Sequence, residues 1–253
     1  MKNVDRRIAL ITGGNRGLGL QTAHELVTQD IHVILGCRNY KQGETVAQEL
    51  REKGYQVEAL ELDVANQSTH QAAYDYLEKE YGRLDILINN AAVWKESTTS
   101  SSLLPDSNRT STLPSEILRE TFETNFFGTV ALTQKLLPLL RKSTAGRIVN
   151  VSSIMGSLTM HSDPKSPIYP HKVFAYDTSK AALNSFTIHL AHELRDTPIK
   201  VNSAHPGWVR TEMGGEGASL DISEGGKTSA WLATLSEDGP TGGYFHMGEA
   251  LPW

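Results

Sequence analysis

Residues 7–19 read RIALITGGNRGLG, a short apolar run that leads into a loop with four glycines. A helical spacing of apolar residues follows, through Ala23, Leu26 and Val27. Glycines permit a tight turn and a close approach of the backbone to a ligand, and a helix N-terminus stabilises negative charge. A strand, a glycine loop and a helix in this order therefore predict a phosphate-binding turn, with a glycine-rich hairpin as the alternative. The residues expected at the phosphates are Gly13, Asn15, Arg16, Gly17, Leu18 and Gly19.

The same alternation of strand and helix continues along the chain. Further strands are expected at residues 32–37, 56–62, 84–88, 147–153, 199–204 and 243–246. Helices are expected at residues 41–54, 68–81, 115–140 and 176–195, and a last helix ends within residues 231–235. This order predicts an α/β fold, a Rossmann-like doubly wound seven-stranded parallel sheet in a single domain over residues 1–253. In such a sheet the ligand site lies at the carboxyl ends of the strands.

The bulk properties of the chain exclude several classes of protein. Its 253 residues suffice for a large core, and a formal net charge of −5 argues against a nucleic-acid or anionic-membrane surface. The single cysteine, Cys37, excludes an internal disulfide and suits a reducing compartment. The N-terminal residues carry no apolar signal segment, and no run of about 18 apolar residues exists. We therefore expect a cytoplasmic protein with neither nucleic-acid nor membrane partners.

Residues at the ends of the second, third and fourth strands indicate a dinucleotide. Arg38 stands where folds of this kind place a carboxylate that binds the ribose hydroxyls of NAD. Together with Arg16 it predicts a cationic clamp for a 2′-phosphate, and therefore a preference for NADPH over NADH, unless both arginines are only solvated. Asp63, next to Val64, is expected to accept a hydrogen bond from the adenine amino group or else to cap the following helix. Asn90 and Ala91 are expected beside the cofactor, where amides tie loops together and small residues leave room.

A tyrosine and a lysine share one face of the helix that begins near residue 176. Tyr176 and Lys180 are four positions apart, so their side chains point the same way. A nearby ammonium favours the phenolate and lowers the pKa of the phenol, which then suits general acid/base catalysis. Ser153, at the end of the preceding strand, can hold the same substrate oxygen. Taken alone, this spacing also fits an ordinary amphipathic helix.

These motifs together resemble the short-chain dehydrogenase/reductase family, and in particular its carbonyl reductase branch. The resemblance runs in the family's order over nearly the whole chain. It rests on Thr12-Gly13-x-x-x-Gly17-x-Gly19, Asn89-Asn90-Ala91, Asn125, Ser153, Tyr176-x-x-x-Lys180 and Pro206-Gly207-Trp208-Val209-Arg210-Thr211.

The resemblance implies a role for each matching residue. Tyr176 is then the acid/base, Lys180 lowers its pKa and binds the nicotinamide ribose, and Ser153 polarises the carbonyl. Ser153 is preferred to Ser152 because the second serine of such a pair faces the substrate in the family. Asn125 is expected to hold a water that relays protons from Lys180 to solvent. The cofactor is further expected to contact Pro206, Gly207, Val209 and Thr211, the last through the nicotinamide carboxamide.

The sequence departs from the family pattern at two places. Ala92 replaces the usual glycine after Asn-Asn-Ala, and its methyl is expected to narrow the crevice near the cofactor. An insert at residues 160–172 carries three prolines, which predict a stiff, non-helical segment. In the carbonyl reductase branch a longer insert covers the helices by which relatives oligomerise. The resemblance therefore favours a monomer, with a homo-oligomer as the alternative.

The substrate is expected to bind among three segments, residues 93–114, 154–175 and 207–228. Candidate pocket residues are Trp94, Met155, Trp208 and Met213, which equally fit an ordinary core. No metal is expected, because His189 and His192 have no carboxylate or thiol at ligand spacing.

The function expected from these residues is the NADPH-dependent reduction of a ketone or aldehyde carbonyl to an alcohol, with a small-molecule carbonyl compound as substrate. The alternatives are an NAD-dependent secondary alcohol dehydrogenase and a nucleotide-sensing protein without activity on the same fold.

Overall fold

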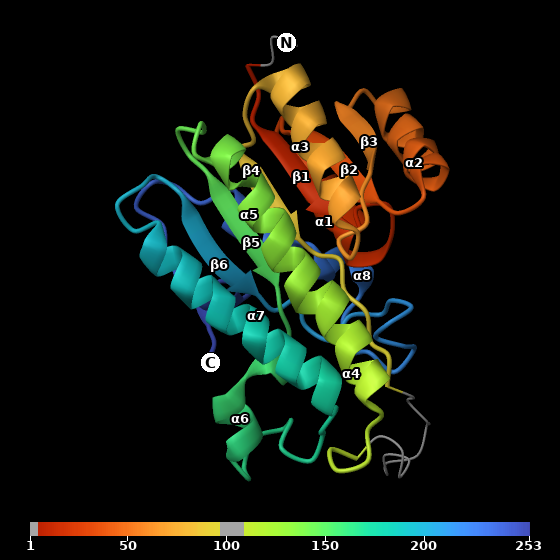
Figure 1. Ribbon diagram of the computed structural model, residues 1–253, viewed down its shortest axis with the longest axis vertical. Coiled ribbons are helices and arrows are strands. Elements are labelled where there is room, and N and C mark those ends of the chain that lie inside the picture. The colour runs from red at the N-terminus through yellow and green to blue at the C-terminus, as the bar shows by residue number, and fades with distance from the viewer. Residues whose placement is uncertain (1–4, 97–108) are drawn as a thin grey trace.

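The strands of the described residues form one eight-stranded sheet in the order β3-β2-β1-β4-β5-β6-β7-β8. Figure 1 labels β1 to β6. The computed structural model describes residues 5–96 and 109–253. The strands are β1 (Ile8–Thr12), β2 (His32–Cys37), β3 (Val57–Glu61), β4 (Ile86–Asn89), β5 (Arg147–Val151), β6 (Lys200–Ala204), β7 (Tyr244–His246) and β8 (Glu249–Ala250).

The expected seven-stranded parallel sheet is confirmed and is extended by one strand. β1 to β7 pair in parallel, whereas β8 runs antiparallel to β7. Met247 and Gly248 join these two strands, and both have positive φ, at 49° and 88°. Two positive φ angles in succession are typical of a tight two-residue hairpin. A two-residue strand is too short to show an apolar pattern in the sequence.

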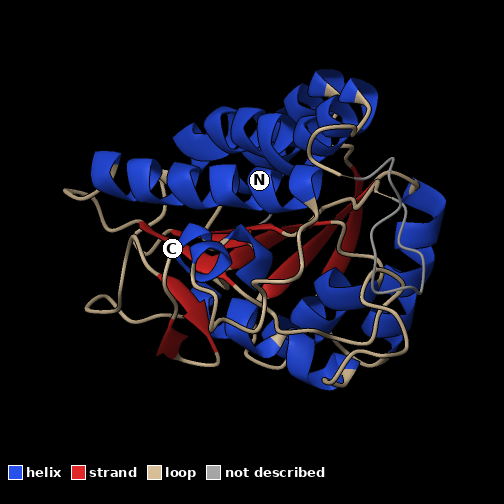
Figure 2. Cartoon of the chain, turned by 90° about the horizontal axis from the view of Figure 1, so that it is seen from below, coloured by secondary structure: helices blue, strands red, loops and turns tan. Residues whose placement is uncertain are grey.

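Helices cover both faces of the sheet (Figure 2). They are α1 (Gly17–Val27), α2 (Tyr40–Glu52), α3 (Gln67–Tyr81), α4 (Ser115–Phe122), α5 (Thr129–Leu140), α6 (Leu158–Ser162), α7 (Phe174–Glu193), α8 (Ile222–Gly225) and α9 (Lys227–Ala233), with a π-helical turn η2 (Glu123–Gly128) and a 3₁₀ turn η3 (Ile154–Gly156).

Each strand contributes alternate residues to two separate cores. Ala9 and Ile11 of β1 pack with α1, α2 and α9 on one face. Ile8 and Leu10 pack with α3, α5 and α7 on the other. Successive side chains of a strand point to opposite faces, so a strand buried on both faces reads as a continuous apolar run. This is why the sequence pattern predicted the central strands well.

Two expected segments differ from the structure. The helix expected over residues 115–140 is interrupted at η2, where the turn widens from an α-helical to a π-helical one. The insert at residues 160–172 is not wholly non-helical, because Met160 lies inside α6. The Ser157 side chain accepts a hydrogen bond from the Met160 main-chain N–H and so starts this helix. The prolines prevent a helix only after α6, because the first of them, Pro164, follows the end of that helix.

The topology fixes where a ligand can bind. The strand order reverses between β1 and β4, because the chain leaves β1 to build β2 and β3 on one side and the remaining strands on the other. In a doubly wound sheet the crevice at the carboxyl ends of two such strands is the ligand site. The loops after β1 and β4, which carry Gly13 and Asn90, meet at this point.

At the amino-terminal ends of the strands, a buried guanidinium group joins several loops. Arg147, the first residue of β5, is 1% exposed. Its nitrogens donate to the carbonyl oxygens of Leu235 at 2.6 and 3.0 Å and of Ser236 at 3.1 Å. They also donate to the carbonyl oxygens of Gly146 at 2.8 Å and of Pro198 at 3.1 Å. One side chain thus joins the start of β5 to the loops that precede β6 and follow α9.

We predict that Arg147→Lys lowers the free energy of unfolding by about 2–4 kcal/mol, because an ammonium cannot reach all of these carbonyls and leaves some buried without a donor. Urea unfolding followed by circular dichroism measures the change. The control is Arg141→Lys, a half-exposed residue whose guanidinium lies 3.4 Å from Glu193 and whose change should stay within about 0.5 kcal/mol. Equal effects of the two substitutions would contradict this account.

Candidate active site

The glycine loop lies between β1 and the first turn of α1. Gly13 and Gly17 adopt positive φ angles of 63° and 54°, which glycine tolerates best. A Cβ built on Gly19 would lie 2.3 Å from the Gly13 carbonyl oxygen, so a larger residue does not fit there. By contrast, no described atom lies within 4 Å of a Cβ built on Gly17. The loop is tight where it meets the protein and open on its outer side.

The N-terminus of α1 is free to bind an anion. Arg16 is its N-cap residue, and within the described structure no side chain caps the first turn. The leading N–H groups of a helix have no partner inside the helix, and its dipole favours negative charge. An uncapped helix behind an open glycine loop fits the phosphates of a dinucleotide. Asn15 and Leu18 belong to this same turn, and their contacts with the cofactor stay predictions.

Asn90 supports the glycine loop from the neighbouring strand. Its side-chain nitrogen donates to the carbonyl oxygens of Thr12 at 2.8 Å and Gly13 at 3.2 Å. In return, the Thr12 hydroxyl accepts from the main-chain N–H groups of Asn90 and Ala91, each at 2.9 Å. Asn89 likewise links β4 to β5 by donating to the Asn150 side chain at 2.8 Å. Both amides therefore tie neighbouring loops and strands together, as the sequence predicted.

The residues expected at the adenosine end lie at the carboxyl ends of β2 and β3. Arg38 directly follows β2 and is exposed. Arg16 is exposed too, and its guanidinium forms an ion pair with Glu212 at 2.5 Å. Asp63 does not cap a helix, because the N-cap of α3 is Asn66. Its carboxylate accepts instead from the Ala65 N–H at 3.0 Å.

Val64 is the buried residue of this group, and its side chain belongs to the second core. Its carbonyl oxygen lies 2.9 Å from the Nε2 atom of His70. The contacts of Arg38, Asp63 and Val64 with adenosine stay predictions.

Tyr176 and Ser153 meet between the start of α7 and the end of β5. Tyr176 lies in the first turn of α7 and is 7% exposed, and the Ser153 hydroxyl is close enough to lower the pKa of its phenol. Burial is the larger effect, and together with the charge of Asp177 it raises the pKa of Tyr176 to about 12. At neutral pH the side chain is therefore a phenol. Ser152 is buried, and its hydroxyl has no hydrogen-bond partner within the described structure.

Lys180 lies one helical turn beyond Tyr176, on the same face. Its ammonium group is 5.7 Å from the centre of the Tyr176 ring and donates to the Val151 carbonyl oxygen at 2.8 Å. Lys180 is 2% exposed, and burial lowers its pKa to about 8. The three side chains expected to act together thus converge at the end of β5. That Lys180 lowers the pKa of Tyr176 stays a prediction.

Asn125 lies in the π-helical turn η2, and its side chain binds Val93 and Ser179. Its side-chain oxygen accepts from the Val93 N–H at 2.8 Å. Its side-chain nitrogen donates to the Val93 carbonyl at 2.9 Å and to the Ser179 hydroxyl at 3.0 Å. Single π-helical turns inside α-helices frequently mark functional sites. That Asn125 holds a proton-relay water stays a prediction.

The segment after β6 begins with a close turn. Gly207 has a φ of 89°, and a Cβ there would lie 2.3 Å from the Leu220 side chain. Pro206 and Val209 are buried, whereas the Thr211 hydroxyl accepts from the Gly214 N–H at 3.0 Å. Trp208 and Met213 are exposed, so neither belongs to the core.

Trp94 and Met155 lie beside the converging side chains. The Trp94 ring stacks on the ring of Tyr176, with 5.0 Å between centroids and 17° between planes. The Met155 N–H donates to the Ser153 hydroxyl at 3.3 Å. Both side chains are half-buried, as a pocket wall requires. Within the expected substrate segment 93–114, residues 97–108 lie outside the described part of the chain.

Two buried side chains that the sequence did not single out support this site. His205, at the end of β6, accepts through Nδ1 from the N–H groups of Ile154 at 3.2 Å and Gly207 at 3.4 Å. It therefore connects the loop after Ser153 to the turn at Gly207. Glu96 accepts from main-chain N–H groups at the start of α7. A single histidine and a single glutamate outside any motif give no signal of such contacts in a sequence.

Two further properties follow from residues 5–96 and 109–253. None of their helices combines the length and the apolar character needed to span a bilayer. Nor do three or more histidine, cysteine or carboxylate side chains gather there in a way that could hold a metal ion.

Known proteins are similar to this chain in architecture and in sequence. The sequence profile described as short chain dehydrogenase matches residues 7–219. Carbonyl reductase [NADPH] 1 of Mus musculus is 30% identical over 98% of this chain and 99% of its own length. Among solved structures, NADPH-bound carbonyl reductase from chicken fatty liver superposes with a TM-score of 0.83, at 26% identity over 99% of this chain and all of the other.

Salutaridine reductase from Papaver somniferum superposes with a TM-score of 0.80, at 28% identity over 96% of this chain and all of the other. The chain belongs to the short-chain dehydrogenase family. Its similarity to carbonyl reductases confirms the expected branch.

We predict an acid-sensitive stability that depends on His205. Burial, and then the nearby His246, lower the pKa of His205 to about 3, whereas an unfolded histidine titrates near ~6.5. Between these values the unfolded chain binds the proton and the folded chain does not, so stability falls as the pH falls through this window. From pH 7 to pH 5 the loss through His205 is about 2 kcal/mol.

Urea unfolding at both pH values measures this loss. In His205→Asn the amide oxygen can still accept from the two N–H groups but does not titrate. The difference between the two pH values should therefore shrink by about 2 kcal/mol in this variant. An unchanged difference would show that His205 binds its proton alike in the folded and the unfolded chain.

Proposed function

We propose that this protein reduces the carbonyl group of a ketone or aldehyde to an alcohol, with Tyr176 as the proton donor. The convergence of Ser153, Tyr176 and Lys180 at the end of β5 carries this proposal. The Ser153 hydroxyl is close to the phenol, so one substrate oxygen can contact both groups. The reduced nicotinamide supplies the hydride when it is bound. The protein positions the carbonyl, polarises it through Ser153 and delivers the proton through Tyr176.

The protonation state of Tyr176 favours reduction over oxidation. Reduction needs a proton donor, whereas oxidation of an alcohol needs a base. Because burial raises the pKa of Tyr176 to about 12, the residue holds its proton at neutral pH. Lys180, whose pKa is lowered to about 8, lies one turn away and can return a proton to the tyrosine through ordered water. This observation favours a reductase over the alternative of a secondary alcohol dehydrogenase.

The cofactor of this oxidoreductase is NADP, and NADPH is preferred over NADH. The relatives named above include an NADPH-dependent and an NADPH-bound carbonyl reductase. In this chain Arg38 follows β2 and Arg16 precedes α1, so each lies after the carboxyl end of a strand, and both are exposed. Two guanidinium groups there suit the additional phosphate of NADPH, because arginine binds phosphate through paired hydrogen bonds.

The substrate is expected to be an apolar or aromatic carbonyl compound. Trp94 covers one face of the Tyr176 ring, and Met155 stands next to the Ser153 loop. Trp208 and Met213 offer further apolar surface on the segment after β6. A pocket of this kind gives most of its binding energy to apolar surface and uses a few polar groups for orientation.

We predict that Tyr176→Phe lowers kcat by roughly 10²–10⁴-fold, since the general acid is removed. The affinity for NADPH, measured by fluorescence titration, should stay within about twofold because the ring remains in place. The absorbance of the reduced nicotinamide, followed with a panel of ketones, aldehydes and quinones, reports turnover. Tyr74→Phe on α3 is the matched control and should retain wild-type turnover. A Tyr176→Phe variant with wild-type kcat would refute the assignment of the proton donor.

We further predict that Arg38→Ala raises KM for NADPH by roughly 10–100-fold and leaves KM for NADH nearly unchanged. A charge-assisted contact with phosphate contributes about 1.5–3 kcal/mol, and NADH has no phosphate at this position. Steady-state kinetics with both cofactors measure the ratio. The control Arg141→Ala removes an exposed arginine that directly follows α5, in the loop before β5. If Arg38→Ala weakens both cofactors equally, Arg38 does not select between them.

A further inference from the structure

Glu96 is a buried carboxylate that caps a helix far away in the sequence. It is 4% exposed, and its Oε1 atom accepts from the N–H groups of Ala175 at 2.6 Å and Tyr176 at 3.3 Å. These are the second and third residues of α7, whose own N-cap residue, Val173, makes no capping bond through its side chain. A carboxylate at this position satisfies free N–H groups and interacts favourably with the helix dipole. One of these N–H groups belongs to the proposed proton donor itself.

The same short segment also holds the Tyr176 side chain. Trp94, two residues before Glu96, stacks on the phenol ring. Val93 is fixed in turn by two hydrogen bonds to the Asn125 side chain. Residues 93–96 therefore contact both the main chain and the ring of Tyr176 and are anchored at their start by the π-helical turn. We call these residues the Tyr176 clamp.

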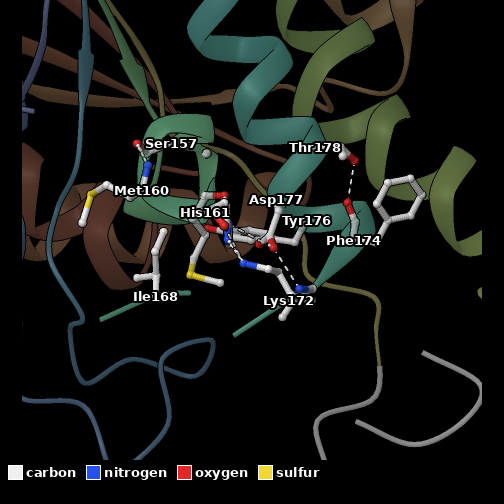
Figure 3. Close-up of polar contacts among 12 residues, drawn as sticks. Ser157, Met160, His161, Ile168, Lys172, Phe174, Tyr176, Asp177 and Thr178 are labelled. Carbon is white, nitrogen blue, oxygen red and sulfur yellow. Dashed lines mark hydrogen bonds and ion pairs between the residues drawn. The ribbon is translucent and has the colours of Figure 1, made fainter. Parts of the chain in front are cut away.

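A second carboxylate in the first turn of α7 binds the insert (Figure 3). Asp177 accepts from the Val173 N–H at 2.8 Å and lies 3.3 Å from the Nε2 atom of His161. Lys172 donates to the His161 carbonyl at 3.0 Å, and its ammonium lies 3.1 Å from the other ring nitrogen of this histidine. Burial, and after it the charge of Glu96, raise the pKa of Asp177 to about 7.

Each of these two carboxylates keeps one oxygen without a hydrogen-bond partner among the described residues. Two neighbouring buried carboxyl groups repel each other when both are charged and cost stability. Keeping both carboxylates at the start of α7 lowers the stability of the fold but fixes the geometry of this helix start. Their common effect is to hold the turn that contains Tyr176 from two sides.

We propose that Glu96 is a positioning residue for Tyr176. Its hydrogen bonds to the N-terminus of α7, together with the stacking of Trp94 from the same segment, fix the phenol beside Ser153. This proposal rests on the proposed function, in which Tyr176 donates the proton. Without the carboxylate the first turn of α7 frays and the phenol leaves its position. A displacement of about 1 Å at a reacting group can cost roughly 10²-fold in rate.

The experiment compares Glu96→Ala, Glu96→Gln and the control Asn66→Ala in the full-length protein. We expect Glu96→Ala to lower kcat by roughly 10–100-fold while the Kd for NADPH stays within about twofold. Glu96→Gln keeps an oxygen that accepts from both N–H groups, so it should restore kcat to within about threefold of wild type. Asn66→Ala removes a comparable cap, the contact of Asn66 with the Ser68 N–H at 3.1 Å, and should leave kcat unchanged.

Hydrogen exchange of the Ala175 and Tyr176 amides tests the contact without any substrate. These amides should be protected in the wild type and in Glu96→Gln and should exchange faster in Glu96→Ala. Wild-type kcat in Glu96→Ala, or a loss shared equally by Asn66→Ala, would overturn the proposal. If the wild type reduces no carbonyl compound, the proposed function fails. Amide exchange then tests the Tyr176 clamp independently of activity, and equal exchange rates in all variants would overturn it.

Discussion

The hydrogen bond from the Lys180 ammonium to the Val151 carbonyl is the interaction on which the site depends. It joins the first turns of α7 to the last residue of β5. An ammonium in such a buried place carries a cost, which is seen in its lowered pKa. In return, the bond fixes the distance between the helix that bears Tyr176 and the strand end that leads to Ser153. A catalytic pair drawn from two elements needs a rigid link of this kind.

The amino and carboxyl ends of the strands have different roles, the first in stability and the second in chemistry. At the amino end, Arg147 uses its donors on main-chain carbonyls and serves the fold alone. At the carboxyl end, Asn90, Asn125 and His205 each bind a loop that carries a residue of the site. Loops provide the chemistry of such folds, and buried polar side chains give those loops their precision.

The sequence allowed much of this structure to be predicted, because its signals were local. The parallel strands were expected from short apolar runs or, for β3, from an alternating pattern, and the glycine loop and the Tyr176–Lys180 spacing could be read directly. The π-helical turn at Asn125, the hairpin at Gly248 and the short helix α6 were missed, since each depends on a single turn. Glu96 and His205 were missed for another reason. Their partners lie some 79 and 51 residues away, and only the folded chain brings them together.

The π-helical turn has a consequence for the whole rod formed by α4, η2 and α5, which Figure 1 shows as nearly continuous. A wider turn accommodates one residue more than an α-helix does, and one residue corresponds to a rotation of about 100°. The faces of α4 and α5 are therefore out of phase by that angle. A chain shorter by one residue here would regain an ordinary helix and would rotate the Asn125 amide away from Val93. The length of this stretch is thus as constrained as its composition.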